Sequence, residues 1–188
     1  MRIIAGKYKK SHLYTLEGND TRPTTDALRE AIFSSLFDVS GFEVLDLFAG
    51  TGAFALEAIS RGAKSAVLVD NSYYAVQVIK KNIKKINCMD IATVKKAKVY
   101  KFIEECDRKF DLIFLDPPYD KAFVNKTLDL IKEYGIIKEN GYIVVEHYFK
   151  EDIDPKWANM IVYRKEKGKN RVAIIKFEKN REQKNEDL

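Results

Sequence analysis

Cysteine and histidine are scarce in this sequence of 188 residues, where each occurs twice. The two cysteines, Cys88 and Cys106, lie far apart, and no histidine pattern accompanies them. The sequence therefore has neither a disulfide framework nor the ligand spacing of a zinc site. These absences predict a protein without a bound metal and fit a reducing, cytoplasmic environment.

Long apolar runs are also missing. No segment approaches the roughly 20 apolar residues that span a bilayer. The N-terminus has only a short apolar pair, Ile3 and Ile4, before the chain turns basic. We therefore expect a soluble, intracellular protein without a signal peptide or a membrane partner. The composition, 46% hydrophobic and 32% charged, is ordinary for a globular protein, and the length suits one domain.

The excess of positive charge is small, a formal +5, but the basic residues are clustered. One cluster consists of Arg2, Lys7, Lys9 and Lys10, a second lies between residues 80 and 101, and a third between 164 and 171. Such clusters can displace counterions from a phosphate backbone. We interpret the middle cluster as solvated surface and the N-terminal one, which alternates with tyrosines, as a nucleic-acid contact.

The pattern from Phe42 onward alternates short apolar strands with helical periods, which is typical of a mostly parallel sheet covered by helices on both faces. We expect strands at 43–48, 65–70, 91–95, 110–115, 140–147, 160–165 and 171–178, and helices at 53–62, 72–86, 99–106 and 121–134. The last two strands are joined by a short basic loop and should form an antiparallel hairpin.

Before the sheet, residues 2–16 indicate a small β-hairpin or an extended arm, and an amphipathic helix should follow with Thr25 as its N-cap. The expected organisation is a basic arm at 1–20, an α/β domain at 21–180 and a frayed tail at 181–188.

A glycine-bearing turn follows the strand at 43–48 in "VLDLFAGTGAFALEAISRGA". Gly50 and Gly52 lie where a ligand approaches the backbone, because a Cβ there would occupy its place. The helix that begins near Ala53 directs unsatisfied N–H groups toward the same place. Asp70, at the end of the next strand, can accept both hydroxyls of a ribose.

Three interpretations of this loop remain open. A purely structural turn is disfavoured by the combination of strand, helix and acidic residue. Gly50-x-Gly52-x-x-Ala55 satisfies the relaxed dinucleotide fingerprint. S-adenosylmethionine has the same ribose and adenine but carries an ammonium group in place of a pyrophosphate, and Asp46 at the strand end can accept that group. The loop alone does not distinguish the two cofactors.

The sequence Asp-Pro-Pro-Tyr at 116–119 ends the strand at 110–115. Neither Pro117 nor Pro118 can donate to a ladder, and Pro118 forces Pro117 into an extended conformation, so a rigid turn follows Asp116. Ligands of open α/β sheets bind at the carboxyl ends of the strands. The turn should therefore lie beside the glycine loop.

The Asp116 carboxylate and the Pro117 carbonyl suit the two N–H donors of a nucleobase exocyclic amine. Holding both protons favours a pyramidal nitrogen whose lone pair can attack a methyl group. Tyr119 would stack on the base, and a base in a duplex would first leave its stack. Hydride transfer has no use for this acceptor pair, which favours S-adenosylmethionine over a dinucleotide. A turn without function is the less favoured alternative.

The motifs "DLFAGTG" and "DPPY" resemble those of class I S-adenosylmethionine-dependent methyltransferases that modify exocyclic amines. Together with "RIIAGKYKK" and "TRPTTDALREAIFSSL", they resemble the RsmD family, whose members methylate the N2 amine of a guanine in 16S ribosomal RNA. The resemblance implies a Rossmann-like, seven-stranded, mostly parallel sheet with the final strand inserted antiparallel, and S-adenosylmethionine as methyl donor.

Motif and charge together assign roles to residues. The expected cofactor contacts are Asp46, Phe48, Ala49, Gly50, Thr51, Gly52, Asp70 and Asn71; the catalytic group is Asp116, Pro117, Pro118 and Tyr119; the substrate contacts are Arg2, Lys7, Lys9, Lys10, Arg22 and Thr24. Lys98 stands where the family usually has an acidic residue or asparagine near adenine. Backbone N–H groups or Asn71 would serve there instead.

We therefore predict a monomeric methyltransferase that acts on a guanine amine in ribosomal RNA or in an assembling small ribosomal subunit. A DNA adenine-N6 methyltransferase is the first alternative, although such enzymes usually carry a separate target-recognition domain for which 188 residues leave no room. A non-catalytic RNA-binding module of the same fold and an NAD-dependent oxidoreductase are the others.

Overall fold

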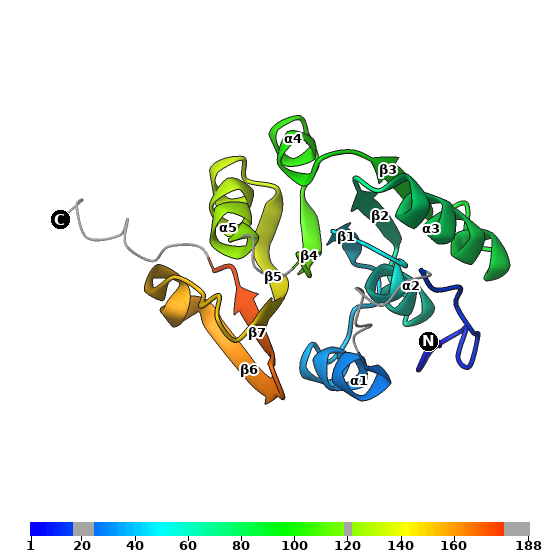
Figure 1. Cartoon of the computed structure of the whole chain (residues 1–188), viewed down its shortest axis with the longest axis horizontal. Helices are drawn as coiled ribbons and strands as arrows, with labels where there is room; N and C mark the ends of the chain where they lie inside the picture. Colours follow the sequence, from blue (N-terminus) through cyan, green and yellow to red (C-terminus); the bar gives the residue numbers. More distant parts are fainter. Residues whose placement is uncertain (17–24, 119–121, 179–188) are drawn as a thin grey trace.

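The computed structural model describes residues 1–16, 25–118 and 122–178, and Figure 1 shows their arrangement. The strands are β1 (Glu43–Leu47), β2 (Ser65–Asp70), β3 (Ala92–Lys96), β4 (Phe110–Leu115), β5 (Ile137–Tyr148), β6 (Ile161–Lys167) and β7 (Asn170–Lys176). The helices are α1 (Asp26–Ser35), α2 (Ala53–Ser60), α3 (Tyr73–Lys85), α4 (Val99–Glu104), α5 (Phe123–Glu133) and a 3₁₀ helix (Pro155–Met160). None of these helices is long and apolar enough to cross a bilayer.

The strands form one seven-stranded sheet in the order β3-β2-β1-β4-β5-β7-β6. β1 to β5 are parallel, while β7 is antiparallel to β5 and β6 is antiparallel to β7. The expected mostly parallel, Rossmann-like sheet with a C-terminal antiparallel hairpin is confirmed. β5 begins at Ile137, three residues before the expected start at 140. It pairs with Phe110 of β4 at Ile137 and with Leu112 at Tyr142, on either side of a register shift.

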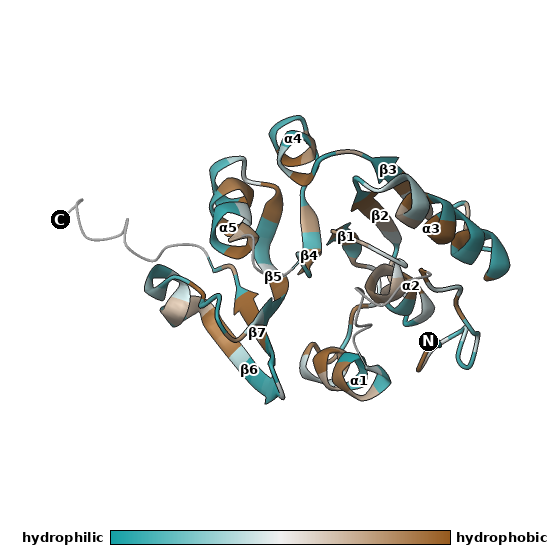
Figure 2. Cartoon of the chain, viewed as in Figure 1, coloured by the Kyte–Doolittle hydropathy of each residue, from teal (hydrophilic) through white to brown (hydrophobic). Residues whose placement is uncertain are grey.

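Side chains alternate between the two faces of the sheet, as the period of two in a strand requires. Val44 and Phe114 pack in the cluster formed with α1, α2 and α3. Leu45 and Ile113 pack in the other cluster, with α4 and α5. Figure 2 shows the same division as apolar strands between helices whose outer faces are hydrophilic.

Thr25 caps α1 as expected: its side-chain oxygen accepts a hydrogen bond from the Leu28 N–H, at 3.3 Å. The apolar face of α1 is buried, and the ring centroid of Phe33 lies 5.6 Å from that of Phe114. α1 begins near the carboxyl edge of the sheet and ends near the amino edge, where the Gly41 N–H donates to the Gly62 carbonyl.

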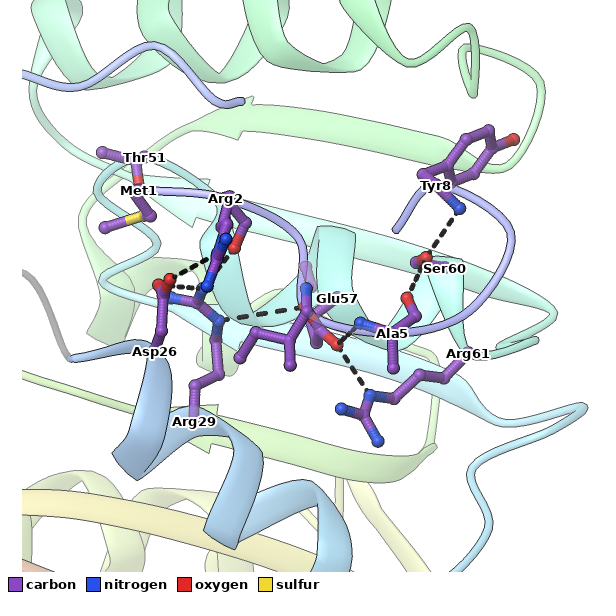
Figure 3. Close-up of polar contacts among 12 residues, drawn as sticks. Met1, Arg2, Ala5, Tyr8, Asp26, Arg29, Thr51, Glu57, Ser60 and Arg61 are labelled. Atoms are coloured by element: carbon purple, nitrogen blue, oxygen red, sulfur yellow. Dashed lines mark hydrogen bonds and ion pairs between the residues drawn. The ribbon is translucent and has the colours of Figure 1, made fainter. Parts of the chain in front are cut away.

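The expected small N-terminal hairpin is present: Arg2 and His12 form an antiparallel bridge, and the Ile3 and Leu13 N–H groups donate to the Ser11 and Met1 carbonyls, at 2.9 and 3.1 Å. The hairpin is attached to α2 by Glu57, a fully buried carboxylate that accepts from the N–H groups of Ile4 (2.8 Å) and Ala5 (3.0 Å). Figure 3 shows Glu57 between this segment and the guanidinium groups of Arg29 and Arg61.

Gly6 packs directly against the last turn of α2. A Cβ added there would lie 1.8 Å from the Ser60 carbonyl oxygen, and the φ of Gly6 is +80°. The Lys7 N–H donates to the same carbonyl, at 2.7 Å. The segment "RIIAGKYKK" therefore reverses its direction where it packs against the C-terminal end of α2. The tail predicted to fray, 181–188, lies outside the described residues.

Candidate active site

The glycine loop and the Asp-Pro-Pro corner meet at the carboxyl edge of the sheet. Asp46 pairs in register with Leu68 of β2 and Phe114 of β4. Asp70 and Asp116 lie two residues further along these strands, so all three carboxylates project from the face that α1, α2 and α3 cover. The arrangement expected from the strand ends is thus present in the structure.

The loop after β1 has a left-handed conformation at several positions. Gly50 has a φ of +56°, and a Cβ there would meet nothing closer than 4.0 Å, which leaves its outer face open to a ligand. Gly52 is required for a different reason. With a φ of +79°, its Cβ would lie 2.8 Å from the Leu68 side chain, so this glycine lets the loop pack on the sheet rather than on a ligand.

Two other contacts fix the loop. Phe48, a bulky residue, has a φ of +59°, a strained conformation of the kind found at functional sites. Its ring centroid lies 5.5 Å from that of Phe123. Asn82 of α3 donates to the Thr51 carbonyl (2.9 Å) and also pairs with the backbone of Tyr14. The loop is thereby connected to the N-terminal segment.

Asp70 organises the loop in addition to its expected role toward a ribose. Its Oδ2 accepts from the Gly50 N–H at 2.9 Å, and its Oδ1 accepts from the Ser72 N–H at 2.8 Å. Each carboxylate oxygen has a second lone pair available for another donor. A ribose hydroxyl could therefore bind while the loop keeps its shape.

Asp46 is buried behind the loop and is only 2% exposed. Its Oδ2 accepts from the Ala55 N–H, in the first turn of α2, at 3.2 Å. Burial raises its pKa well above the usual range, the Ala55 N–H opposes that rise, and the negative charge of Asp70 adds to it. A cation in contact with Asp46 would relieve this cost, as the ammonium group of a methionine moiety would.

The Asp-Pro-Pro corner follows directly after Leu115, the last residue of β4. Asp116 is partly exposed, Pro117 is buried and Pro118 is exposed. Burial raises the pKa of Asp116 well above the usual range, and the charges of Glu146 and then Asp46 raise it further. Tyr119, the predicted stacking residue, lies outside the described residues.

Glu146 is a site residue that the sequence analysis did not assign. Val145 of β5 pairs in register with Leu115, which places Glu146 beside Asp116 on the same face of the sheet. Glu146 is 2% exposed, and its Oε1 accepts from the Asn170 amide at 2.9 Å. The only signal for it in the sequence is an acidic residue at the end of an apolar strand.

The predicted cofactor contacts near adenine flank the loop. Asn71 is exposed directly after β2, and Lys98 is exposed at the start of α4, where its side chain forms no capping bond. The Ala97 N–H donates to the Asp70 carbonyl at 3.1 Å. Ala49 is buried and its N–H donates to the Val69 carbonyl. The contacts of Asn71 and Ala49 with a cofactor stay a prediction.

The structure separates the predicted substrate contacts. Arg2 lies near the loop: its guanidinium contacts Asp26 at the start of α1 (3.1 Å), and the preceding Met1 sulfur accepts from the Thr51 hydroxyl. Lys7, Lys9 and Lys10 lie at the chain reversal beside Ser60. Because α2 runs away from the carboxyl edge, these lysines lie at its far end. Arg22 and Thr24 lie outside the described residues.

Comparisons with known proteins show which family the chain belongs to. A family model described as "Conserved hypothetical protein 95" matches residues 1–176. The YlbH protein of Bacillus subtilis (strain 168) is 37% identical over 183 residues, which cover 94% of this chain and 98% of that protein. "Ribosomal RNA small subunit methyltransferase D" of Buchnera aphidicola (strain APS) is 32% identical over 171 residues, with 84% and 88% covered.

A solved structure gives the same result. The yhhF protein of Escherichia coli superposes with a TM-score of 0.84 at 27% identity, covering 95% of this chain and 98% of that one. The resemblance that "DLFAGTG", "DPPY" and the two N-terminal motifs indicated is confirmed. The chain belongs to the conserved hypothetical protein 95 family, which is the RsmD family of methyltransferases.

Proposed function

We propose that this protein transfers a methyl group from S-adenosylmethionine to the exocyclic N2 amine of a guanine in small-subunit ribosomal RNA. The observation that carries the proposal is the position of the Asp116–Pro117 corner, at the same sheet edge and on the same face as the glycine loop. Relatives named "Ribosomal RNA small subunit methyltransferase D" support the choice of substrate.

The residues of the loop fit S-adenosylmethionine better than a dinucleotide. Asp46 is buried where the methionine end would lie, and this burial raises its pKa, so a cationic partner would stabilise the ionised carboxylate. An ammonium group would supply that partner, whereas a pyrophosphate would be repelled. Gly50 leaves open space above the loop, and Asp70 can accept from the ribose.

S-adenosylmethionine supplies an electrophilic methyl carbon. Asp116 and the Pro117 carbonyl would accept the two amine protons and so aim the nitrogen lone pair at that carbon. Transfer would form a C–N bond as the C–S bond of the donor breaks, with the electron pair of that bond left on sulfur. The methylated nitrogen then loses its surplus proton to water. Asp116 serves to orient the amine and does not need to be a strong base.

Nucleoside analysis of ribosomal RNA tests the proposal. The RNA from cells that lack the gene should lack one N2-methylguanosine of the small-subunit RNA, and the purified protein with S-adenosylmethionine should restore it. Loss of N6-methyladenine from DNA instead would support the adenine alternative. If both nucleic acids are unchanged in the deletion strain and the purified protein methylates neither, the proposal is wrong.

Glu146 gives a prediction for the pH dependence. The ionised form of Asp116 is the stronger acceptor for the amine protons, so the rate should rise with pH through the pKa of Asp116. Glu146→Gln removes the neighbouring charge that raises this pKa, so we expect the acid limb of the pH–rate profile to move to lower pH. The amide still accepts from Asn170.

The matched control is Glu139→Gln, an exposed glutamate near the opposite end of β5. Its profile should equal that of the wild type. Because the charge of Glu146 acts on Asp116, the profile reports the two carboxylates together rather than one residue. An unchanged acid limb in Glu146→Gln, or one displaced to higher pH, would show that the charge of Glu146 does not act on the catalytic group.

A further inference from the structure

We propose that the tip of the β6–β7 hairpin binds phosphates of the RNA that flank the target nucleotide. The tip carries four basic residues, Arg164, Lys165, Lys167 and Lys169. This inference rests on the proposed function, because it names the surface that would hold the RNA beside the catalytic corner. It assigns a role to the third basic cluster, which the site itself does not use.

The register of the sheet places the tip at the edge that carries the site. Asn170 pairs with Tyr148 at the end of β5 and with Lys167 across the hairpin. Tyr148 lies two residues beyond Glu146, so the tip projects roughly 7 Å further along the strands than Asp116 and lies roughly 10 Å to the side. Figure 1 shows the end of the hairpin beside α1.

Specific contacts hold the tip in that position. The Lys167 ammonium donates to the Thr25 hydroxyl at the start of α1, at 3.1 Å. The Phe149 N–H donates to the Lys169 carbonyl at 3.0 Å, and the Asn170 amide donates to Glu146, the neighbour of Asp116. The basic residues are thereby fixed relative to the catalytic corner.

The charges of the tip are available to a ligand. Glu166 and Asp152, two acidic residues near the tip, both pair with Arg171, at 3.3 and 3.1 Å. Within the described part of the chain, Arg164, Lys167 and Lys169 form no ion pair, and all three are exposed. Figure 2 shows the end of the hairpin as strongly hydrophilic.

An aromatic residue beside the tip favours RNA as the occupant. Phe149 is 37% exposed beside the tip, with the exposed Lys150 above its ring, which offers a base-stacking face next to the phosphate contacts. The lysines of the N-terminal segment, by contrast, lie at the far end of α2. Lysines on an edge strand also prevent sheet-to-sheet pairing, but that role does not require them at the active-site edge.

The test compares two double variants. Lys167→Gln with Lys169→Gln removes two charges from the tip, and Lys80→Gln with Lys84→Gln removes two exposed charges from α3. The affinity of each full-length protein for small-subunit ribosomal RNA is measured over a range of salt concentrations. The affinity for S-adenosylmethionine and the unfolding midpoint are measured in parallel, to show that both variants are folded.

We expect the tip variant to bind RNA more weakly than the wild type, with a plot of log affinity against log salt concentration that is shallower by about 1.4 for contacts to a single strand. The α3 variant should keep the wild-type slope. Equal slopes in both variants would overturn the inference. The inference would also be overturned if the tip variant kept its RNA affinity and lost activity only on assembling subunits. That result would indicate a protein partner.

The inference and the proposed function can fail separately. A wild-type protein that binds ribosomal RNA with a tip-dependent salt slope but methylates no guanine would refute the proposed function and leave the surface assigned. If the wild-type protein forms N2-methylguanosine but the salt slope of its RNA affinity does not depend on Lys167 and Lys169, the proposed function stands and the inference is refuted.

Discussion

Replacement of Asp116 by alanine is expected to lower turnover by about 10²–10⁴-fold, in the range found when an orienting or charge-stabilising group is removed. In the proposed mechanism the carboxylate and the Pro117 carbonyl each hold one amine proton, and the Pro117 carbonyl alone would not fix both. Single-turnover methylation of small-subunit ribosomal RNA measures the effect. The affinity for S-adenosylmethionine should change little, because Asp46 and Asp70 remain in place.

Asp116→Asn and Asp107→Ala provide the matched controls. The asparagine keeps one acceptor and the size of the side chain but lacks the charge, so an intermediate loss is expected. Asp107 is exposed in the turn before β4, and its replacement should leave turnover unchanged. Wild-type turnover in Asp116→Ala would refute the proposed mechanism, whereas a parallel loss of donor affinity would place Asp116 in the cofactor site instead.

Glu57→Ala should cause the largest loss of stability, about 3–5 kcal/mol in the free energy of unfolding, as for one partner removed from a buried ion pair. Glu57 accepts from two backbone N–H groups and from Arg61 at 2.7 Å, and its Oε2 lies 3.9 Å from Arg29, which is 1% exposed. The variant would leave all of these donors with fewer partners (Figure 3).

Urea unfolding measures this effect, with Glu104→Ala as the control because Glu104 is exposed on α4. The control should remain within about 0.5 kcal/mol of the wild type. A loss below about 1 kcal/mol in Glu57→Ala would mean that the N-terminal segment is held mainly by its apolar contacts. A further expectation is that the N-terminal segment becomes more accessible to proteases in this variant.

The sequence predicted the sheet well, because its strands are short apolar runs separated by turn residues. The boundaries of β1, β2 and β4 agree to within a residue. The 3₁₀ helix at Pro155–Met160 was not predicted, because six residues beginning with proline have no periodicity to detect. The small N-terminal hairpin was predicted, but its attachment to Glu57 was not, because Glu57 lies far along the chain.

The candidate site could be located from the sequence but not fully explained by it. Strand ends and turn residues identified the loop and the corner. Other roles depend on contacts in the folded chain. A glycine is needed at position 52 because the Leu68 side chain of β2 packs against it, and Asp70 holds the loop by accepting from the Gly50 N–H. Glu146 becomes a neighbour of Asp116 only through the pairing of β4 with β5. Contacts between segments that are distant along the chain produce no local sequence pattern from which they could be predicted.

The central claim is that the Asp116–Pro117 corner faces a methyl donor held over the glycine loop. A crystal structure of the protein with S-adenosylmethionine tests it most directly. The account predicts the methionine ammonium at Asp46, the ribose at Asp70 and the methyl group directed toward the corner, with space for a base between them. A donor bound elsewhere, or one whose methyl group points away from Asp116, would contradict the account.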